Sequence, residues 1–310
     1  MNKDDFVYWV FTFWSLPTIY CLFSIYFKRF PYEHTRTKSG TALNVFFTYQ
    51  MTNTIAVIYL GIMGIILYIY QEYQNISIIN PPIYLHSNRL VYTLIYPMMV
   101  YQFYSIVLYL LAPMPELGGT VMLLHHIATL TLGLFSVYPR PYLQGYSIFF
   151  FGIVELSTIP LQGVDLYKHI RYTKQFNPIF QSRFQIFFAV SFLSLRVGLW
   201  PIISVHFWRN AVDLLLNSAA HSPAIVIFSL CANLYLSLLQ FYWGAIIIRK
   251  LCRLINNTDN NRIFLCNFTD IKTVIVATFQ FQSPERLKYH MNISQKYDLV
   301  DDNIETKTEL

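Results

Sequence analysis

Seven long apolar stretches constrain the fold of this 310-residue chain more than any other feature of its sequence. A helix needs roughly 20 residues to cross a hydrocarbon core about 30 Å thick. With 55% hydrophobic and 12% charged residues, the stretches predict an all-α integral membrane protein, a bundle of about seven transmembrane helices. We place the helices at residues 6–27, 45–70, 90–112, 117–138, 142–162, 184–206 and 223–248.

A change in composition near residue 253 separates the apolar part of the chain from a polar end. We expect three parts along the sequence. Residues 1–42 form the first transmembrane helix and a basic loop, and residues 43–253 form the main transmembrane domain. Residues 254–310 form a polar, partly disordered cytosolic tail, because they are too polar to build a core of their own.

Basic residues in the connections predict the orientation, because cytoplasmic loops carry an excess of lysine and arginine. They gather after the first, fifth and seventh stretches, which end on the same side if every stretch spans. We therefore expect the N-terminus outside or in a lumen and the C-terminus in the cytosol. Asn75-Ile-Ser77 is then a lumenal glycosylation sequon, so Asn75 is a candidate glycan acceptor.

The net charge of +6 comes largely from these basic connections. A basic rim that meets anionic headgroups explains it, so we expect membrane lipids as partners and no nucleic acid. In an alternative interpretation, four basic residues after the fifth helix hold the phosphates of acyl-coenzyme A as a co-substrate, with no tightly bound cofactor. These residues are Lys168, Arg171, Lys174 and Arg183. Whether the protein forms a homodimer is left open at this point.

Two adjacent histidines, His125 and His126, lie in the fourth stretch, where an ionisable residue is costly in lipid and therefore indicates a site. Counting about 1.5 Å per residue from the cytosolic face places them roughly 12 Å deep. The same count places Glu155, on the fifth helix, roughly 10 Å deep. A short loop joins these two helices, so the sequence predicts that the carboxylate and the imidazoles lie close together.

Further polar residues reach similar depths on other helices, and buried polar groups need partners where water is scarce. We expect them to line a polar cavity that opens toward the cytosolic leaflet. Arg196 lies deeper, where it could pair with Glu155 or close the cavity floor. The candidate lining residues are Gln50, Asn53, Thr129, Ser136, Thr158, Gln162, Arg196 and Gln240.

The candidate catalytic residues are His125, His126 and Glu155. Adjacent helical residues point about 100° apart, so the two histidines must differ in role. His125 shares a face with Thr129 and Ser136, and we expect it to line the cavity, while His126 bonds a neighbouring helix. His125 could accept a proton from an amine or hydroxyl, with Glu155 as its partner, or it could only fix helix packing. We expect no metal site, because two adjacent histidines alone make a poor chelate.

The run His125-His-Ile-Ala-Thr129, followed by Phe135-Ser136 and Gly145, resembles the TLC-domain family, the membrane fold shared by ceramide synthases and several lipid-handling proteins. A ceramide synthase would carry a second His-Asp pair and a further aspartate on the fifth helix. This chain instead has Glu155-Leu-Ser-Thr-Ile-Pro160, which is similar to the TLC-domain-containing branch tied to membrane lipid composition. The resemblance implies a lipid substrate or ligand and the endoplasmic reticulum membrane.

Two functions from different classes stay open. In the first, the protein binds, senses or regulates membrane lipids of sphingolipid or fatty-acyl metabolism. In the second, it is an N-acyltransferase that joins an acyl group from acyl-CoA to a sphingoid-type amine, with His125 as base. A seven-helix receptor shares the expected topology, but the chain lacks cysteines in predicted lumenal loops and an acidic-Arg-aromatic run closing the third helix.

Overall fold

The computed structural model describes residues 3–28, 43–76, 89–111, 119–137, 143–170, 178–217, 220 and 222–258. Within these ranges the chain is helical apart from short turns, and no residue forms a strand. The chain divides into two compact units, Met1–Leu251 and Cys252–Leu310. The first unit carries the features described below, and the predicted polar tail lies, from residue 259 on, outside the described residues.

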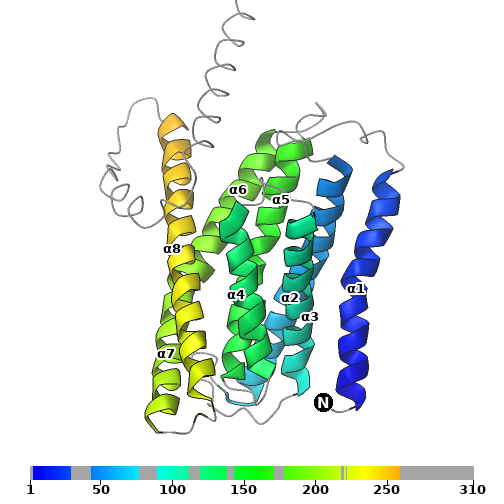
Figure 1. The fold of residues 1–310 in the computed structure, drawn as a ribbon. Coiled ribbons are helices and arrows are strands. Elements are labelled where there is room, and N and C mark those ends of the chain that lie inside the picture. Colours follow the sequence, from blue (N-terminus) through cyan, green and yellow to red (C-terminus); the bar gives the residue numbers. More distant parts are fainter. Residues whose placement is uncertain are drawn as a thin grey trace, which may run out of the picture. The chain divides into compact units, whose positions relative to one another are not determined.

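Seven helical stretches of the described chain are long and apolar enough to cross a membrane, which confirms the predicted fold class. Within the first unit they lie side by side with similar directions (Figure 1). The α-helices are α1 (Lys3–Lys28), α2 (Leu43–Tyr73), α3 (Arg89–Leu111), α4 (Gly119–Val137), α5 (Thr158–Ile170), α6 (Pro178–Phe192), α7 (Trp200–Leu216) and α8 (Pro223–Thr258). Shorter helices complete two spans: η3 (Gln144–Tyr146), η4 (Ile148–Gly152) and η5 (Ile153–Ser157) precede α5, and η7 (Leu193–Leu199) joins α6 to α7.

The sixth span is longer than the sequence indicated, because it continues from Arg183 to Leu216 while we expected it to end at residue 206. Hydropathy falls after that point, where Arg209 and Asp213 appear. The helix nevertheless continues, because apolar side chains keep recurring on one face at helical spacing. The buried apolar residues of that face are Ile203, Phe207, Ala211 and Leu214.

Helix α2 packs against α1, α3, η4, η5 and α5, so it touches much of the unit. At one point α2 meets the fifth span backbone to backbone. A Cβ atom on Gly64 would lie 2.7 Å from the carbonyl carbon of Gly152 and 2.6 Å from the backbone nitrogen of Ile153. Small residues allow this close approach between membrane helices. The contact fixes the beginning of η5, the segment that carries Glu155.

Helix α8 is joined to the rest of the first unit through large side chains. The indole Nε1 of Trp200 donates a hydrogen bond to Oγ of Ser237 at 2.9 Å. The rings of Phe135 and Phe228 meet edge to face with centroids 5.2 Å apart. Trp200 and Phe135 also line the pocket described next, so the residues that hold α8 in place shape that pocket as well.

Candidate functional site

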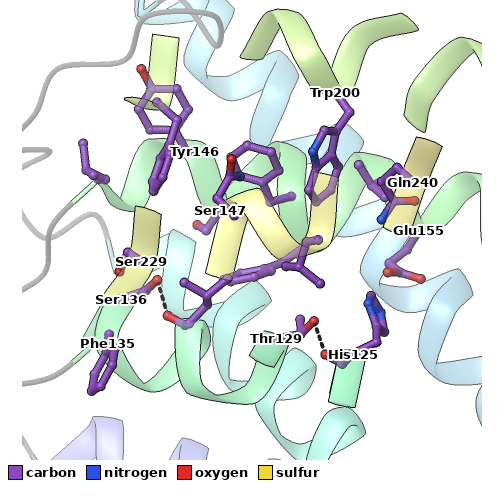
Figure 2. Close-up of a pocket in the computed structure, with 18 of the residues that line it drawn as sticks. His125, Thr129, Phe135, Ser136, Tyr146, Ser147, Glu155, Trp200, Ser229 and Gln240 are labelled. Carbon is purple, nitrogen blue, oxygen red and sulfur yellow. Dashed lines mark hydrogen bonds between the residues drawn. The ribbon is translucent and has the colours of Figure 1, made fainter. Parts of the chain in front are cut away.

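A pocket lies between α4, the fifth span, the sixth span and α8 (Figure 2). Its empty space amounts to about 820 Å³, including space that is open to the surroundings. Figure 2 shows His125, Glu155 and Gln240 at one end and Phe135, Ser136 and Ser229 at the other. Between the ends, the walls are mainly aromatic and aliphatic: Leu132, Phe150, Phe151, Val154, Trp200, Phe207 and Leu236 all line the pocket. The pocket therefore has a polar end at His125, Glu155 and Gln240, the hydroxyl groups of Ser136 and Ser229 at the opposite end, and mainly apolar walls between the two.

The pocket is elongated along the helices. Its lining residues on α4 extend from His125 to Ser136, and those on α8 from Ile225 to Gln240. At about 1.5 Å per residue these spans correspond to roughly 16 Å and 22 Å. From the polar end, the lining continues toward the end of α4 and the beginning of α8. In the predicted orientation this is the lumenal side. We expected the cavity to extend toward the cytosolic leaflet instead. Counting depth gives the level of the polar groups, but it does not give the direction in which the space beside them extends.

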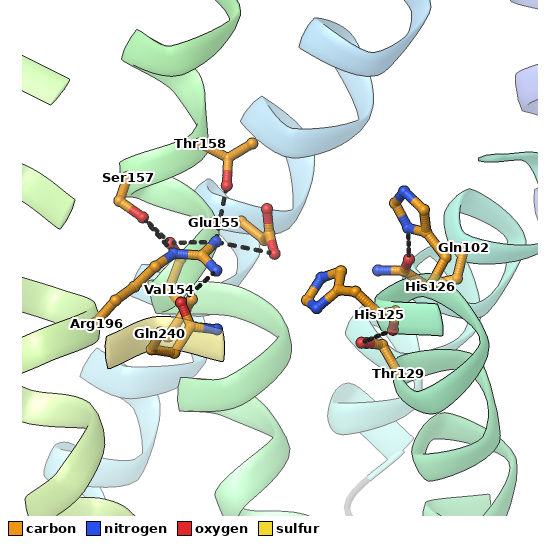
Figure 3. A network of polar contacts seen from close by, with 10 residues as sticks. All are labelled: Gln102, His125, His126, Thr129, Val154, Glu155, Ser157, Thr158, Arg196 and Gln240. Carbon is orange, nitrogen blue, oxygen red and sulfur yellow. Dashed lines mark hydrogen bonds and ion pairs between the residues drawn. The ribbon is translucent and has the colours of Figure 1, made fainter. Parts of the chain in front are cut away.

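Arg196 organises the polar end of the pocket (Figure 3). Its side chain is buried, and Nη2 lies 3.6 Å from Oε1 of Glu155 in an ion pair. Nε donates to Oγ of Ser157 at 2.8 Å, and Nη2 donates to Oγ1 of Thr158 at 2.9 Å. Nη1 donates to Oε1 of Gln240 at 3.4 Å. The guanidinium therefore connects the fifth span to α8, and of the two roles we considered for Arg196 the structure shows the pairing with Glu155.

Both charged residues lie on irregular helical segments. Arg196 belongs to η7, a π-helix in which the backbone N–H of Trp200 bonds the carbonyl of Leu195, and Glu155 belongs to the 3-10 helix η5. A proline follows each segment within three residues, Pro201 and Pro160. Proline lacks the backbone N–H and crowds the preceding turn, which favours such departures from α geometry. Short π segments are frequent at functional sites.

The two histidines differ in their surroundings, as expected from their adjacent positions. His126 is buried, and its Nδ1 donates to Oε1 of Gln102 on α3 at 2.5 Å. His125 lines the pocket and packs its ring edgewise against Trp243 of α8, with centroids 5.6 Å apart. Its buried Nδ1 atom has no hydrogen-bond partner in the described part of the chain. His126 thus joins α4 to α3, and His125 faces the pocket.

In the described residues, no hydrogen bond forms the dyad that we considered between His125 and Glu155. Glu155 pairs with Arg196 instead. The reason lies in the sixth span, because η7 brings a permanent cation to the carboxylate. From the sequence, pairing with Glu155 was one of two roles considered for Arg196, the other being to close the cavity floor.

The other candidate lining residues divide into two groups. Thr129, Ser136, Arg196 and Gln240 line the pocket together with His125 and Glu155. Gln50, Asn53 and Gln162 are buried but do not line it, and Thr158 contributes by accepting a hydrogen bond from Arg196. An oxygen of each of the three buried amides lacks a partner among the described residues. Counting residues gives the level of a side chain along its helix, but it does not give the rotation of that helix.

The remaining predicted residues lie at the edges of the spans or outside the description. Arg183 is exposed near the beginning of α6, and Lys168 lies in the last turn of α5. Arg171 and Lys174 lie outside the described residues, so the expected phosphate cluster stays a prediction. Asn75 is exposed just after α2, with a φ of 55°.

Two residues at the polar end were not predicted from the sequence. Ser157 accepts a hydrogen bond from Arg196 and belongs to the Glu-Leu-Ser-Thr run described above. Counting by α-helical faces from Glu155 omitted Ser157, because the local helix is a 3-10 helix. Trp243 contacts His125, and an aromatic residue one turn beyond Gln240 could have been considered. In the described ranges, no group of three or more His, Cys, Asp or Glu residues is placed to hold a metal ion.

Comparison with known proteins gives one match. The family model described as TLC domain matches residues 6–249, from the first apolar helix to the last. No curated protein and no solved structure matches the chain. Because the family model covers well over half of the sequence, this chain belongs to the TLC-domain family.

Proposed function

We propose that this multi-pass membrane protein binds a membrane lipid in the pocket between α4 and α8, and that it senses or regulates membrane lipid composition through this binding. The observation that carries the proposal is the shape and chemistry of the pocket. It is elongated, with apolar walls along its length and a polar end built around Arg196 and Glu155. An acyl chain fits such walls, and a headgroup fits the polar end.

The apolar walls support a hydrocarbon ligand over a small polar one. Phe150, Trp200 and Leu236 come from three different spans and face the same space. A polar solute would leave these walls in contact with its polar groups, at a cost in free energy. Ligand pockets of this kind typically combine mainly apolar walls with a few polar groups that orient the ligand.

A second candidate is the N-acyltransferase, and one observation favours it: His125 faces the pocket with Nδ1 unpartnered among the described residues. A general base must lie within hydrogen-bond reach of the proton that it removes, and the position of His125 on the pocket wall supports this role. The pairing of Glu155 with Arg196 counts against this candidate, because it takes away the carboxylate that would orient or stabilise the imidazole. We therefore rank lipid binding first.

We also propose that the protein lies in the endoplasmic reticulum membrane and takes part in sphingolipid or fatty-acyl metabolism, as the family resemblance implies. The basic connections support a lumenal N-terminus, and the sequon at Asn75 supports a glycan there. The exposure of Asn75 after α2 supports its access to the glycosylation machinery.

Lipid retention by the purified protein tests the binding proposal. Ser229→Trp places a bulky side chain in the pocket from α8, and we expect native mass spectrometry to show loss of the co-purified lipid. Leu234→Trp is the matched control, because Leu234 is 48% exposed on the same helix. Equal lipid retention by both variants would contradict the proposal.

Acyl transfer is tested separately with labelled acyl-CoA and a sphingoid base. Formation of N-acyl product by the wild-type protein, lost in His125→Ala, would establish the enzyme. Purified protein that retains lipid but forms no N-acyl product would rule out the acyltransferase function.

A further inference from the structure

The headgroup that the pocket accepts can be inferred from the charges at its polar end. Arg196 and Glu155 are the only basic and acidic side chains of the Arg, Lys, Asp and Glu types among the described residues that line the pocket, and they form an ion pair. Their charges cancel. The guanidinium is also surrounded by acceptors, since Ser157, Thr158 and Gln240 each accept one of its hydrogen bonds. A further anion would therefore meet a cation that is already neutralised and hydrogen-bonded.

Two buried atoms at the same end of the pocket lack partners within the described residues: Nε2 of Gln240 and Nδ1 of His125. The orientation of the Gln240 amide is determined by Arg196, because only the amide oxygen can accept from Nη1 of the guanidinium. The amide nitrogen is therefore a donor, and Gln240 is 1% exposed. Buried donors are normally satisfied, so an unpaired donor that lines a pocket indicates a missing acceptor.

We expect selection among lipid headgroups at this end, because the ion pair and the unpaired Gln240 donor lie here. Lipid tails are as apolar as aliphatic side chains, so moving an acyl chain from the bilayer into the pocket changes its free energy little. A phosphate headgroup would bring one or two negative charges next to Glu155 in a water-poor site, which is costly unless a free cation is available. A hydroxyl or ester carbonyl instead supplies the acceptor that Gln240 lacks.

We infer that the pocket selects lipids with an uncharged headgroup, whose hydroxyl or carbonyl oxygen accepts a hydrogen bond from Nε2 of Gln240, over lipids that carry a phosphate. The inference rests on the proposed lipid binding and adds the headgroup class to it. The neutrality of the Arg196–Glu155 pair excludes the phosphate, and the unpaired Gln240 donor recruits the oxygen.

The test compares two lipids with identical acyl chains, dioleoylglycerol and dioleoyl phosphatidic acid, for binding to the full chain by native mass spectrometry. For the wild-type protein we expect dioleoylglycerol to bind at least tenfold more tightly. Equal binding, or tighter binding of phosphatidic acid, would overturn the inference while lipid binding itself stands. Binding of neither lipid would overturn the proposed function and the inference together.

Two variants test the physical reason. Glu155→Gln leaves Arg196 as an unpaired cation, and we expect it to reverse the order so that phosphatidic acid binds more tightly. Gln240→Leu removes the donor, and we expect at least a tenfold loss of affinity for dioleoylglycerol. The control is Leu238→Ala, at a position 58% exposed on the same helix, which should change the affinity for neither lipid. An unchanged headgroup order in Glu155→Gln would overturn the charge argument. Because the wild-type ranking needs no substitution, a variant that fails to fold leaves the inference testable.

Discussion

Replacing Arg196 by methionine should destabilise the fold far more than an exposed substitution does. The change removes the cation but leaves Glu155, whose side chain is 12% exposed, without a counter-charge. Thr158 and Gln240 also lose the guanidinium hydrogen bonds that reach them at 2.9 and 3.4 Å. Breaking a buried ion pair by removing one partner typically costs about 3–5 kcal/mol. We expect Arg196→Met to lower the free energy of unfolding by that amount.

A double substitution separates the lost charge pair from lost packing. In Arg196→Met/Glu155→Leu no uncompensated charge remains, and buried ion pairs replaced by apolar residues of similar volume are often near neutral. Ser157 keeps a partner, because its hydroxyl donates to the backbone carbonyl of Val154 at 2.7 Å. We therefore expect the second substitution to restore at least about 2 kcal/mol of the loss.

Reversible unfolding in lipid bicelles measures these differences. Arg209→Met is the matched control, since Arg209 is exposed on the same span, and surface substitutions usually change stability by less than about 0.5 kcal/mol. If Arg196→Met unfolds within about 1 kcal/mol of the wild type, or if the double variant is less stable than the single one, then mutual neutralisation of Arg196 and Glu155 does not stabilise the polar end of the pocket.

Three further predictions concern helix contacts and orientation. Gly64→Ala should lower the free energy of unfolding by about 1–3 kcal/mol, because the new Cβ would meet the backbone of the fifth span. Gly198→Ala should be tolerated, since the nearest atom to its new Cβ would lie at 3.5 Å. Thermal unfolding compares the two variants. Gln102→Met should cost about 1 kcal/mol by loss of its hydrogen bond from His126, and a double-mutant cycle with His126→Phe that shows no coupling would contradict the contact. Wild-type protein expressed in eukaryotic cells should lose a glycan on endoglycosidase treatment and Asn75→Gln should not; an identical shift in both would overturn the predicted orientation.

The number of spans could be predicted because crossing a hydrocarbon core requires continuous apolar helix, and the part of the chain that the structure describes has seven such stretches. The end of the sixth span could not be predicted, because Arg209 and Asp213 lower the hydropathy while the buried face of α7 continues past them. The π-helix η7 was also missed. Its sequence, residues 193–199, reads as ordinary helix, and only Pro201 hints at a departure.

At the candidate site, counting residues from the membrane face placed His125, Glu155 and Gln240 at one level, and the structure places all three on the pocket wall. The same count also selected Gln50 and Asn53, which are buried but do not line the pocket. Depth depends on the rise per residue, which is nearly constant, whereas the direction of a side chain depends on how each helix is rotated and where it is distorted. Long-range packing determines both, so a single sequence does not give them.

Photo-crosslinking most directly tests the claim that the pocket between α4 and α8 holds a lipid. A dioleoylglycerol analogue with a diazirine in one acyl chain would be bound to the purified protein, irradiated, and its attachment sites mapped by peptide mass spectrometry. We expect attachment to the pocket walls, at Trp200 and Leu236, that unlabelled dioleoylglycerol prevents. Attachment confined to outward-facing residues of α8 such as Leu234 and Leu238, unaffected by competitor, would contradict lipid binding in the pocket.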